Sequence, residues 1–304
     1  MAITQGAKPD QGKVIFFLVL TTFFWGGSFL FTKLGVADVP PPYFVLLRFG
    51  LASLLLGLAC LSRLRRLNRL ILQRGVLVGL ALGTTNLTFV IGVQGTSISR
   101  AGVLNNLFVL FIPLIAKLVW KERIGASNAV GILLASCGIG LLVGGGACGF
   151  NRGDLISTLC AFFIALQIIT VSKVLKDDDV WLVSLVQFCV VTIMAGFTAC
   201  LTAPPTIQLS CKAMASIVYC AIFPTIICFT LQNKYQRHVT PTQAGLIYTL
   251  DPVWSLLAGF IVLGERLNVR EWCGCGLIFA AVLLPLAVRL VYEQRLKQRY
   301  APAA

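Results

Sequence analysis

The sequence predicts an all-α membrane protein in which ten transmembrane helices form two inverted five-helix repeats. Of the 304 residues, 58% are hydrophobic and only 12% are charged, and the mean hydropathy is +0.89. Because a soluble domain carries roughly 25% charged residues, lipid must cover much of this surface. The apolar residues also fall into a series of segments about 20 residues long, which is the length that crosses a bilayer. In addition, the second half of the chain repeats the first.

The internal repeat consists of identical residues that lie 143 positions apart with no gap. The matching residues are Ala101-Gly102 with Ala244-Gly245, Leu107 with Leu250, Glu122-Arg123 with Glu265-Arg266, and Gly131 with Gly274. Each half contains five apolar segments. Because five is an odd number, the second half must enter the membrane from the opposite side, which makes the repeat an inverted one.

Polar and turn-forming stretches separate the predicted helices. In the first repeat, residues 13–146, helices are expected at 13–35, 43–61, 74–93, 100–120 and 127–146. In the second repeat, residues 154–292, they are expected at 154–175, 181–201, 213–233, 242–263 and 272–292. Prolines, glycines or charged residues stand at the breaks, namely at 40–42, 63–74, 144–146, 177–179, 204–205 and 238–241. No cleavage site follows the first segment, so we expect it to remain as a span.

The basic residues predict the orientation of the chain. If the N-terminal tail, residues 1–12, is cytoplasmic, most basic residues fall in inner loops or in the C-terminal tail, residues 293–304. Lysine and arginine are retained on the cytoplasmic side during insertion. We therefore expect both termini in the cytoplasm of a plasma membrane or bacterial inner membrane. The same distribution accounts for the net charge of +14 without nucleic acid, and the expected contact of these loops is the lipid bilayer.

The cysteines and the single histidine predict neither a metal site nor a cofactor. The 11 cysteines are scattered through apolar segments, where they are expected to be small buried side chains. Cys273 and Cys275 form the one close pair, and no histidine stands near them. His238 lies in a basic loop. The acidic run at 177–179 is expected to be a solvated turn.

Several residues occur in an order found in a known family. They are Trp25-Gly26-Gly27-Ser28, Lys33, Arg48, the Glu-Arg pairs at 122 and 265, and the stretch from Pro241-Thr242-Gln243 through Asp251-Pro252-Val253 to Gly264. Over residues 14–290 or so, the chain resembles the EamA-like ten-helix members of the drug/metabolite transporter superfamily. The resemblance implies a central cavity and transport of small metabolites such as amino acids. Small multidrug-resistance relatives carry a glutamate in the first helix; this first span has none, so their drug–proton mechanism is not implied.

Two charged residues inside apolar segments are the leading candidates for a binding site, because an ionisable group in hydrocarbon costs roughly 2.5–3.5 kcal/mol or more. Asp251 lies near the middle of the ninth segment, and the adjacent Pro252 loosens the helix there. Its carboxylate can bind a cationic group or a proton, or it can serve the fold by pairing with an arginine. Arg48 can extend to the outer surface, pair with Asp251, or bind a substrate carboxylate. One acid and one base beside a cavity would suit a zwitterion.

Uncharged polar residues and aromatic residues are further candidates for the cavity wall. The candidates are Trp25, Asn86, Asn105, Asn106, Gln167 and Tyr248, with Gln94, Gln187 and Gln232 as similar but weaker ones. The repeat relates the asparagine pair to Tyr248 and Thr249. Amides can bind substrate, or they can join helices; the glycines beside Trp25 can equally mark close helix packing. Glu122 and Glu265 are expected at helix ends on opposite faces, with gating as the alternative role.

These features predict a secondary transporter that moves a small metabolite, an amino acid or a related polar solute, by alternating access. Export is the expected direction, and protons acting through Asp251 are the default energy source, since no GxxxxGK[ST] loop for ATP is present. The alternatives are an intramembrane enzyme, for which too few acidic and histidine residues converge, and a membrane scaffold or receptor. A monomer or a homodimer is expected.

Overall fold

The computed structural model describes residues 10–96, 98–121, 125–143, 151–201, 209–254, 257, 269–270, 272–274, 276–281, 283–284 and 287–288. Every regular element in these residues is helical, as expected. Six helical stretches are long and apolar enough to cross a membrane: Gln11–Asp38, Pro41–Ala59, Arg69–Gly95, Arg152–Val174, Val180–Leu201 and Cys211–His238. Shorter apolar helices occur at Phe108–Val119, Ala126–Leu141 and Trp272–Ala281. The chain is therefore a multi-pass helical membrane protein.

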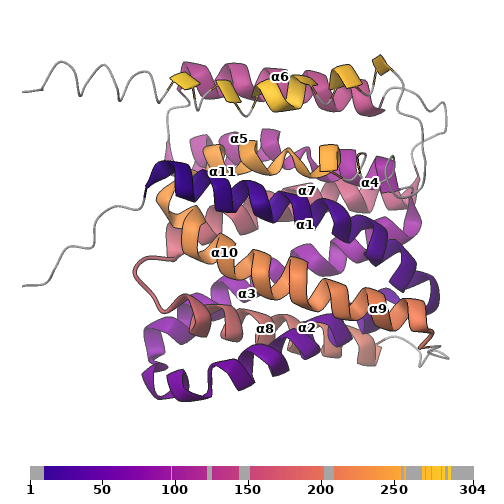
Figure 1. Ribbon diagram of the computed structural model, residues 1–304, viewed down its shortest axis with the longest axis vertical. Helices are drawn as coiled ribbons and strands as arrows, with labels where there is room; N and C mark the ends of the chain where they lie inside the picture. Colours follow the sequence, from indigo (N-terminus) through magenta and orange to yellow (C-terminus); the bar gives the residue numbers. More distant parts are fainter. Residues whose placement is uncertain are drawn as a thin grey trace, which may run out of the picture.

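The first half contains three long helices followed by three shorter ones (Figure 1). They are α1 (Gln11–Asp38), α2 (Pro41–Ala59), α3 (Arg69–Gly95), α4 (Ile98–Asn105), α5 (Phe108–Trp120) and α6 (Ala126–Val143), with the short 3₁₀ helix η1 (Leu61–Arg66) before α3. Side-chain caps fix two of the starts. The Asp10 carboxylate accepts the amide of Gly12 at 3.2 Å, and the Asn68 side chain accepts the amide of Ile71 at 2.9 Å.

The second half begins with two long helices and continues with a composite one. They are α7 (Arg152–Val174), α8 (Val180–Leu201), α9 (Cys211–Cys220), the π-helical stretch η2 (Ala221–Ile227), α10 (Cys228–Tyr235), the 3₁₀ helix η3 (Gln236–His238) and α11 (Pro241–Tyr248). Reciprocal capping boxes start two helices, one formed by Asn151 and Asp154 at α7 and one by Thr240 and Gln243 at α11.

Two predicted spans are broken where continuous helices were expected. The expected helix 100–120 is interrupted between α4 and α5, and the expected helix 242–263 is interrupted after α11. At the first break the amide of Leu107 bonds back to the Leu104 carbonyl at 3.2 Å; at the second, the amide of Leu250 bonds back to the Ile247 carbonyl at 3.2 Å. These are the tighter bonds of a 3₁₀ turn. The repeat therefore extends to matching backbone hydrogen bonds.

At one end of the bundle, ion pairs join η1 and the first turns of α3 to the loop after α7. Arg74 contacts the Asp178 carboxylate at 2.7 Å, and Arg63 contacts Asp179 at 3.4 Å. The Asp178 side chain is only 7% exposed. The acidic run at 177–179 is therefore a turn with an exposed Asp177, as expected, whereas Asp178 and Asp179 are partly buried and each pairs with an arginine of the first half.

At the opposite end, Lys33 of α1 caps the end of α3 by donating to the carbonyls of Val93 and Thr96, each at 2.7 Å. The Thr96 hydroxyl in turn bonds Asp154, at the start of α7, at 2.7 Å. The end of α1 and the start of α7 therefore lie at the same end of the bundle. It follows that α1 and α7, which occupy the same place in the two repeats, run in opposite directions.

Helix α3 joins the two halves, since it packs against both α7 and α8. Its α8 face carries Gly75, Gly79 and Gly83, one residue per helical turn. A Cβ at these positions would lie 2.7 Å from Val186, 2.8 Å from Val190 and 2.5 Å from Met194, respectively. Small residues at four-residue spacing let two helices approach closely in a membrane. The two halves are thus interlocked along α3 and α8.

Buried apolar side chains form two main clusters. One is built chiefly from α1, α5, α6, α7 and α11, and the other chiefly from α2, α3, α8 and α9. In Figure 1, α2, α3 and α8 lie in the lower part of the molecule and α5, α6 and α11 in the upper part, with α1 between them. Trp25 of α1 packs against both clusters, so it stands at the boundary between them.

Candidate functional site

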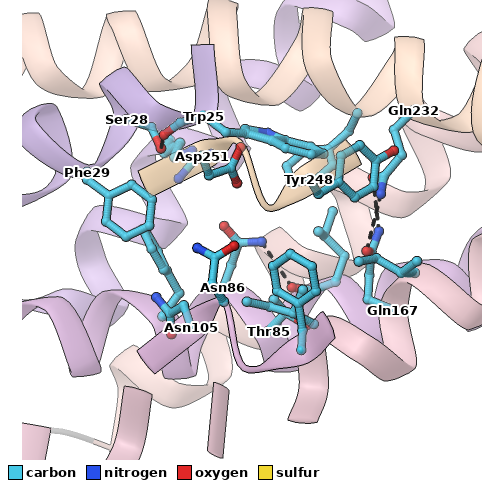
Figure 2. Close-up of a pocket in the computed structure, with 18 residues that line it drawn as sticks. Trp25, Ser28, Phe29, Thr85, Asn86, Asn105, Gln167, Gln232, Tyr248 and Asp251 are labelled. Carbon is cyan, nitrogen blue, oxygen red and sulfur yellow. Dashed lines mark hydrogen bonds between the residues drawn. The ribbon is translucent and has the colours of Figure 1, made fainter. Parts of the chain in front are cut away.

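A cavity lies between the two apolar clusters (Figure 2), and its wall includes members of both. It is lined by Trp25, Ser28, Phe29, Arg48, Leu82, Thr85, Asn86, Phe89, Asn105, Asn106, Phe108, Ile164, Gln167, Ile168, Phe229, Gln232, Tyr248 and Asp251. Both halves of the chain therefore contribute to one site within the helical bundle.

All eight residues predicted for the cavity wall line this one cavity. They are Trp25, Arg48, Asn86, Asn105, Asn106, Gln167, Tyr248 and Asp251. Of the weaker candidates, Gln232 also lines it, whereas Gln94 and Gln187 do not. Glu122 and Glu265, predicted for helix ends, lie outside the described residues. The structure thus brings the predicted set together, while its binding role stays a prediction.

Asp251 points its carboxylate toward the cavity (Figure 2). Its Oδ1 atom is buried and has no hydrogen-bond partner in the described part of the chain, where Asp251 also makes no ion pair. The residue opens a short helical turn, residues 251–254, directly after the break. Pro252 has no N–H to donate to the helix, so this segment does not continue α11 regularly. A buried carboxylate is costly unless a cation or a proton meets it.

Asn105 and Asn106 bring further unmet hydrogen-bonding groups to the first break. They are 2% and 1% exposed. Neither polar side-chain atom of Asn105 has a partner among the described residues, and neither does Oδ1 of Asn106, whose Nδ2 donates to the Gly102 carbonyl at 2.7 Å. An unmet buried polar atom costs about 1–3 kcal/mol. Three such atoms beside a cavity indicate that a ligand or water completes their hydrogen bonds.

Arg48 is 2% exposed, which excludes its extension to the outer surface. Its Nε atom donates to the Thr225 hydroxyl at 2.7 Å and to the Cys220 carbonyl at 3.2 Å. Within the described residues, Arg48 makes no ion pair with Asp251 and its terminal nitrogens make no hydrogen bond. Because Arg48 lines the cavity, these nitrogens can bind an anionic group there.

The partners of Arg48 are available because of the π-helical stretch η2. Pro224 lacks an N–H, so the Cys220 carbonyl four residues earlier loses its helical donor. The Thr225 hydroxyl, at 2.6 Å, and the Arg48 Nε donate to that carbonyl instead. The Pro224 carbonyl accepts the indole N–H of Trp25 at 3.1 Å. One irregular turn therefore fixes two cavity residues, and such π turns are frequent at functional sites.

Aromatic rings form much of the remaining wall. The Trp25 ring lies edge-on to Tyr248, with centroids 5.1 Å apart, and 5.4 Å from the Phe229 ring. Phe29 and Phe89 form a second edge-on pair, with centroids 5.1 Å apart. Aromatic faces can stack on a planar group or attract a cation. This part of the wall therefore suits the apolar or cationic portion of a solute.

Gln167 and Tyr248 belong to a network of amide hydrogen bonds in the second half of the chain. The Tyr248 hydroxyl donates to Gln236 Oε1 at 3.0 Å, and Gln232 Nε2 donates to the same oxygen at 2.7 Å. Gln167 Nε2 donates to Gln232 Oε1 at 3.1 Å, a bond drawn in Figure 2. Because these groups satisfy one another, the network holds the Tyr248 ring in place against the cavity.

Sequence reasoning missed most of the apolar wall and also the groups that support Arg48. Phe29, Phe89 and Phe229 line the cavity, but a phenylalanine that faces a cavity looks in sequence like one that faces lipid. The sequence did contain a signal for the role of Thr225. This residue follows Pro224 in the middle of a predicted span, where a proline frees a carbonyl that needs another donor.

The wall residues supply the groups of a site that binds a small polar solute. An acid and a base face the cavity without neutralising each other, and unmet amide atoms and aromatic rings accompany them. Among the described residues, no group of three histidine, cysteine or acidic side chains could hold a metal ion.

Comparisons with known proteins agree with this picture. A sequence model of the EamA-like transporter family matches the chain twice, at residues 12–144 and 151–286. An uncharacterized transporter from Archaeoglobus fulgidus is 28% identical over 88% of this chain and 83% of its own length. A protein from Chlamydia muridarum named S-adenosylmethionine/S-adenosylhomocysteine transporter is 24% identical over 95% of both chains. A solved crystal structure with 21% identity superposes with a TM-score of 0.75 over 92% of this chain and 99% of that chain, which shows a shared fold.

Proposed function

This chain belongs to the EamA-like transporter family, and we propose that it is a secondary transporter of a small zwitterionic metabolite, such as an amino acid or a related polar solute. The observation that carries the proposal is that Asp251 and Arg48 line one cavity without forming an ion pair, among the described residues. Opposite charges in a weakly polarisable interior attract strongly. A solute that carries both charges would satisfy each of them.

The groups of the cavity match the two ends of such a solute. The terminal nitrogens of Arg48 would bind a carboxylate, and the Asp251 carboxylate would bind an ammonium or another cationic group. Unmet amide atoms of Asn105 and Asn106 would add hydrogen bonds. The rings of Trp25 and its neighbours would cover the apolar part of the solute.

The names of two relatives suggest the first solutes to test. The proteins from Chlamydia muridarum and Chlamydia trachomatis are named S-adenosylmethionine/S-adenosylhomocysteine transporters, and they are 24% and 23% identical to this chain. Both compounds carry an α-amino acid group, and they also carry an adenine ring that could stack on aromatic side chains. A transport assay of this chain should therefore include both compounds beside the common amino acids.

The proposed architecture is an inverted repeat of five helices in each half, with ten spans in all. Support comes from the opposite directions of α1 and α7 and from the matching breaks after Asn105 and Tyr248. In such folds, solute binds between the repeats and is released to either side by alternating access. We propose export, with both termini cytoplasmic.

Proton coupling is proposed to act through Asp251. Its carboxylate would bind either a proton or the cationic end of the solute, so that release of one accompanies capture of the other. The lack of a protein counter-ion for Asp251 in the described residues supports this exchange, because the carboxylate then depends on the cavity contents for its neutralisation.

The test is flux through the purified full-length protein in liposomes. Radiolabelled S-adenosylmethionine, S-adenosylhomocysteine and a panel of amino acids would be presented with and without a proton gradient. We expect saturable movement of at least one zwitterion, faster with the gradient and absent from protein-free liposomes. Release of a chemically altered product would indicate an enzyme, and no movement of any zwitterion would refute the proposal.

A further inference from the structure

Within the part of the chain that the structure describes, hydrogen bonds hold the guanidinium of Arg48 at one edge, its Nε atom. Its Nε donates to the Thr225 hydroxyl and to the Cys220 carbonyl of the π turn, and its Cζ lies 5.2 Å from the centre of the Phe49 ring. The side chain comes from α2 in the first half, whereas both acceptors belong to the second half. A guanidinium has five N–H donors in one plane. Fixing Nε therefore fixes the direction in which the two terminal nitrogens face.

Thr225 is the stronger of the two acceptors. Its hydroxyl is fully buried and lies 2.7 Å from Nε, while the Cys220 carbonyl lies at 3.2 Å, the long limit for such a bond. The same hydroxyl donates to the Cys220 carbonyl at 2.6 Å. It therefore has one partner as a donor and another, the Arg48 Nε, as an acceptor. The β-branched side chain of threonine also restricts rotation of the hydroxyl.

We propose that Thr225 is a positioning residue that orients Arg48 so that its two terminal nitrogens receive the anionic group of the solute end-on. A carboxylate can meet arginine either at the two terminal nitrogens or at Nε and one of them. Because Nε is already occupied by Thr225, only the end-on approach remains. The inference rests on the proposed function for the identity of the solute, but the orientation of Arg48 can be tested without it.

The first test measures the Nε–H of Arg48 directly. Purified protein labelled with ¹⁵N-arginine would be examined by NMR, with Arg48→Lys used to assign the resonance. We expect a slowly exchanging Arg48 Nε–H in the wild type and in Thr225→Ser, which keeps the hydroxyl. Thr225→Val, which has the same shape without the hydroxyl, should lose that protection. Equal exchange in the wild type and Thr225→Val would overturn the proposal.

The second test separates positioning from general damage. Uptake of S-adenosylhomocysteine would be compared with uptake of methylthioadenosine, which keeps the nucleoside thioether but lacks the amino acid group. Thr225→Val should raise KM roughly tenfold for the first and leave KM for the second unchanged, because a bond to a charged group is lost only with the first. Thr225→Ser should restore the wild-type value. An equal change in KM for both solutes would overturn the proposal.

A matched control uses the same substitution elsewhere. The Thr198 hydroxyl of α8 donates only to carbonyls of its own helix, at 2.9 and 3.1 Å. Thr198→Val should therefore leave the Arg48 resonance and both KM values unchanged. If the wild type moves no zwitterion, the proposed function fails, and the NMR experiment alone decides whether Thr225 orients Arg48.

Discussion

The two broken helices have the same backbone hydrogen-bond pattern at the break but carry different side chains there. At both breaks, amides bond three residues back, and the positions correspond through the repeat. All four residues that follow line the cavity, two from each break. Asn105 of the first break corresponds through the repeat to Tyr248 of the second, and Phe108 corresponds to Asp251. The same kind of turn, present once in each half, therefore brings neutral amides to the cavity from the first half and a carboxylate from the second.

The polar side chains at the two breaks also differ in whether they already have a hydrogen-bond partner. Asn105 has two side-chain atoms without a partner in the described residues, and Asp251 has one, whereas the Tyr248 hydroxyl is bonded to Gln236. A buried polar group without a protein partner needs another one, such as water or a solute that enters the cavity. A partnered group contributes to the fold. Substitutions at the two breaks should therefore affect binding or stability, but rarely both.

The largest effect is expected for Asp251→Asn. The substitution keeps the shape and removes the charge, so gradient-driven transport should fall by roughly 100-fold, the value of a lost charge-assisted bond of about 3 kcal/mol. The melting temperature in detergent serves as the control for folding. Normal gradient-driven transport by this variant would show that Asp251 takes no part in coupling. The proposed functional difference between the two breaks would then be wrong.

A smaller effect on affinity is expected for Asn105→Leu. Leucine fills a similar volume without the two unmet polar atoms, so KM for the transported solute should rise roughly tenfold. The melting temperature should stay constant or rise, because an unsatisfied buried amide is removed. A lower melting temperature with an unchanged KM would instead show that the amide joins helices.

Tyr248→Phe should give the opposite pattern to Asn105→Leu. Its hydroxyl bonds Gln236, so its removal should lower the free energy of unfolding by about 1 kcal/mol or less, as for other hydrogen bonds within membranes. Thermal unfolding in detergent measures this change. KM should stay within about twofold of the wild type, since such a bond supports the wall indirectly. A large rise in KM would place the hydroxyl itself on the solute.

The smallest effect is expected for Thr249→Val. The Thr249 hydroxyl donates to the Leu246 carbonyl of its own helix at 2.7 Å, and such local bonds contribute little. Both the melting temperature and KM should remain close to wild type. A clear loss of affinity would show that the turn at the second break has to be held by this side chain.

The polar part of the site was predictable, because lipid tolerates few polar groups in a span. That rule selects Asp251, Arg48 and the amides without knowledge of their contacts. The second break had a local signal in Pro252, but Val109, its counterpart in the first repeat, gives none. The first break could be inferred only by transferring the second one through the repeat.

Contacts between distant segments were not predictable from a single sequence. Nothing in the local pattern shows that Asp178 meets Arg74, or that Arg48 reaches Thr225, because each pair joins segments far apart in the chain. The same limit applies to the phenylalanines of the wall, whose local sequence is equally compatible with lipid. The choice between roles for Arg48 therefore had to wait for the fold.

The glycines of α3 form the closest contact described above between the two halves. Gly75, Gly79 and Gly83 let α3 lie close against α8, and α3 has no side chain at these positions that could fill a gap between the two helices. Separating the two helices would leave a void between them and lose the dispersion energy of the contact. If the chain works by the proposed alternating access, we expect the contact between α3 and α8 to stay closed while α1 and the composite helix Cys211–His238 move. Bending of that helix at its π turn would move Arg48 and Trp25, because both side chains are hydrogen-bonded there.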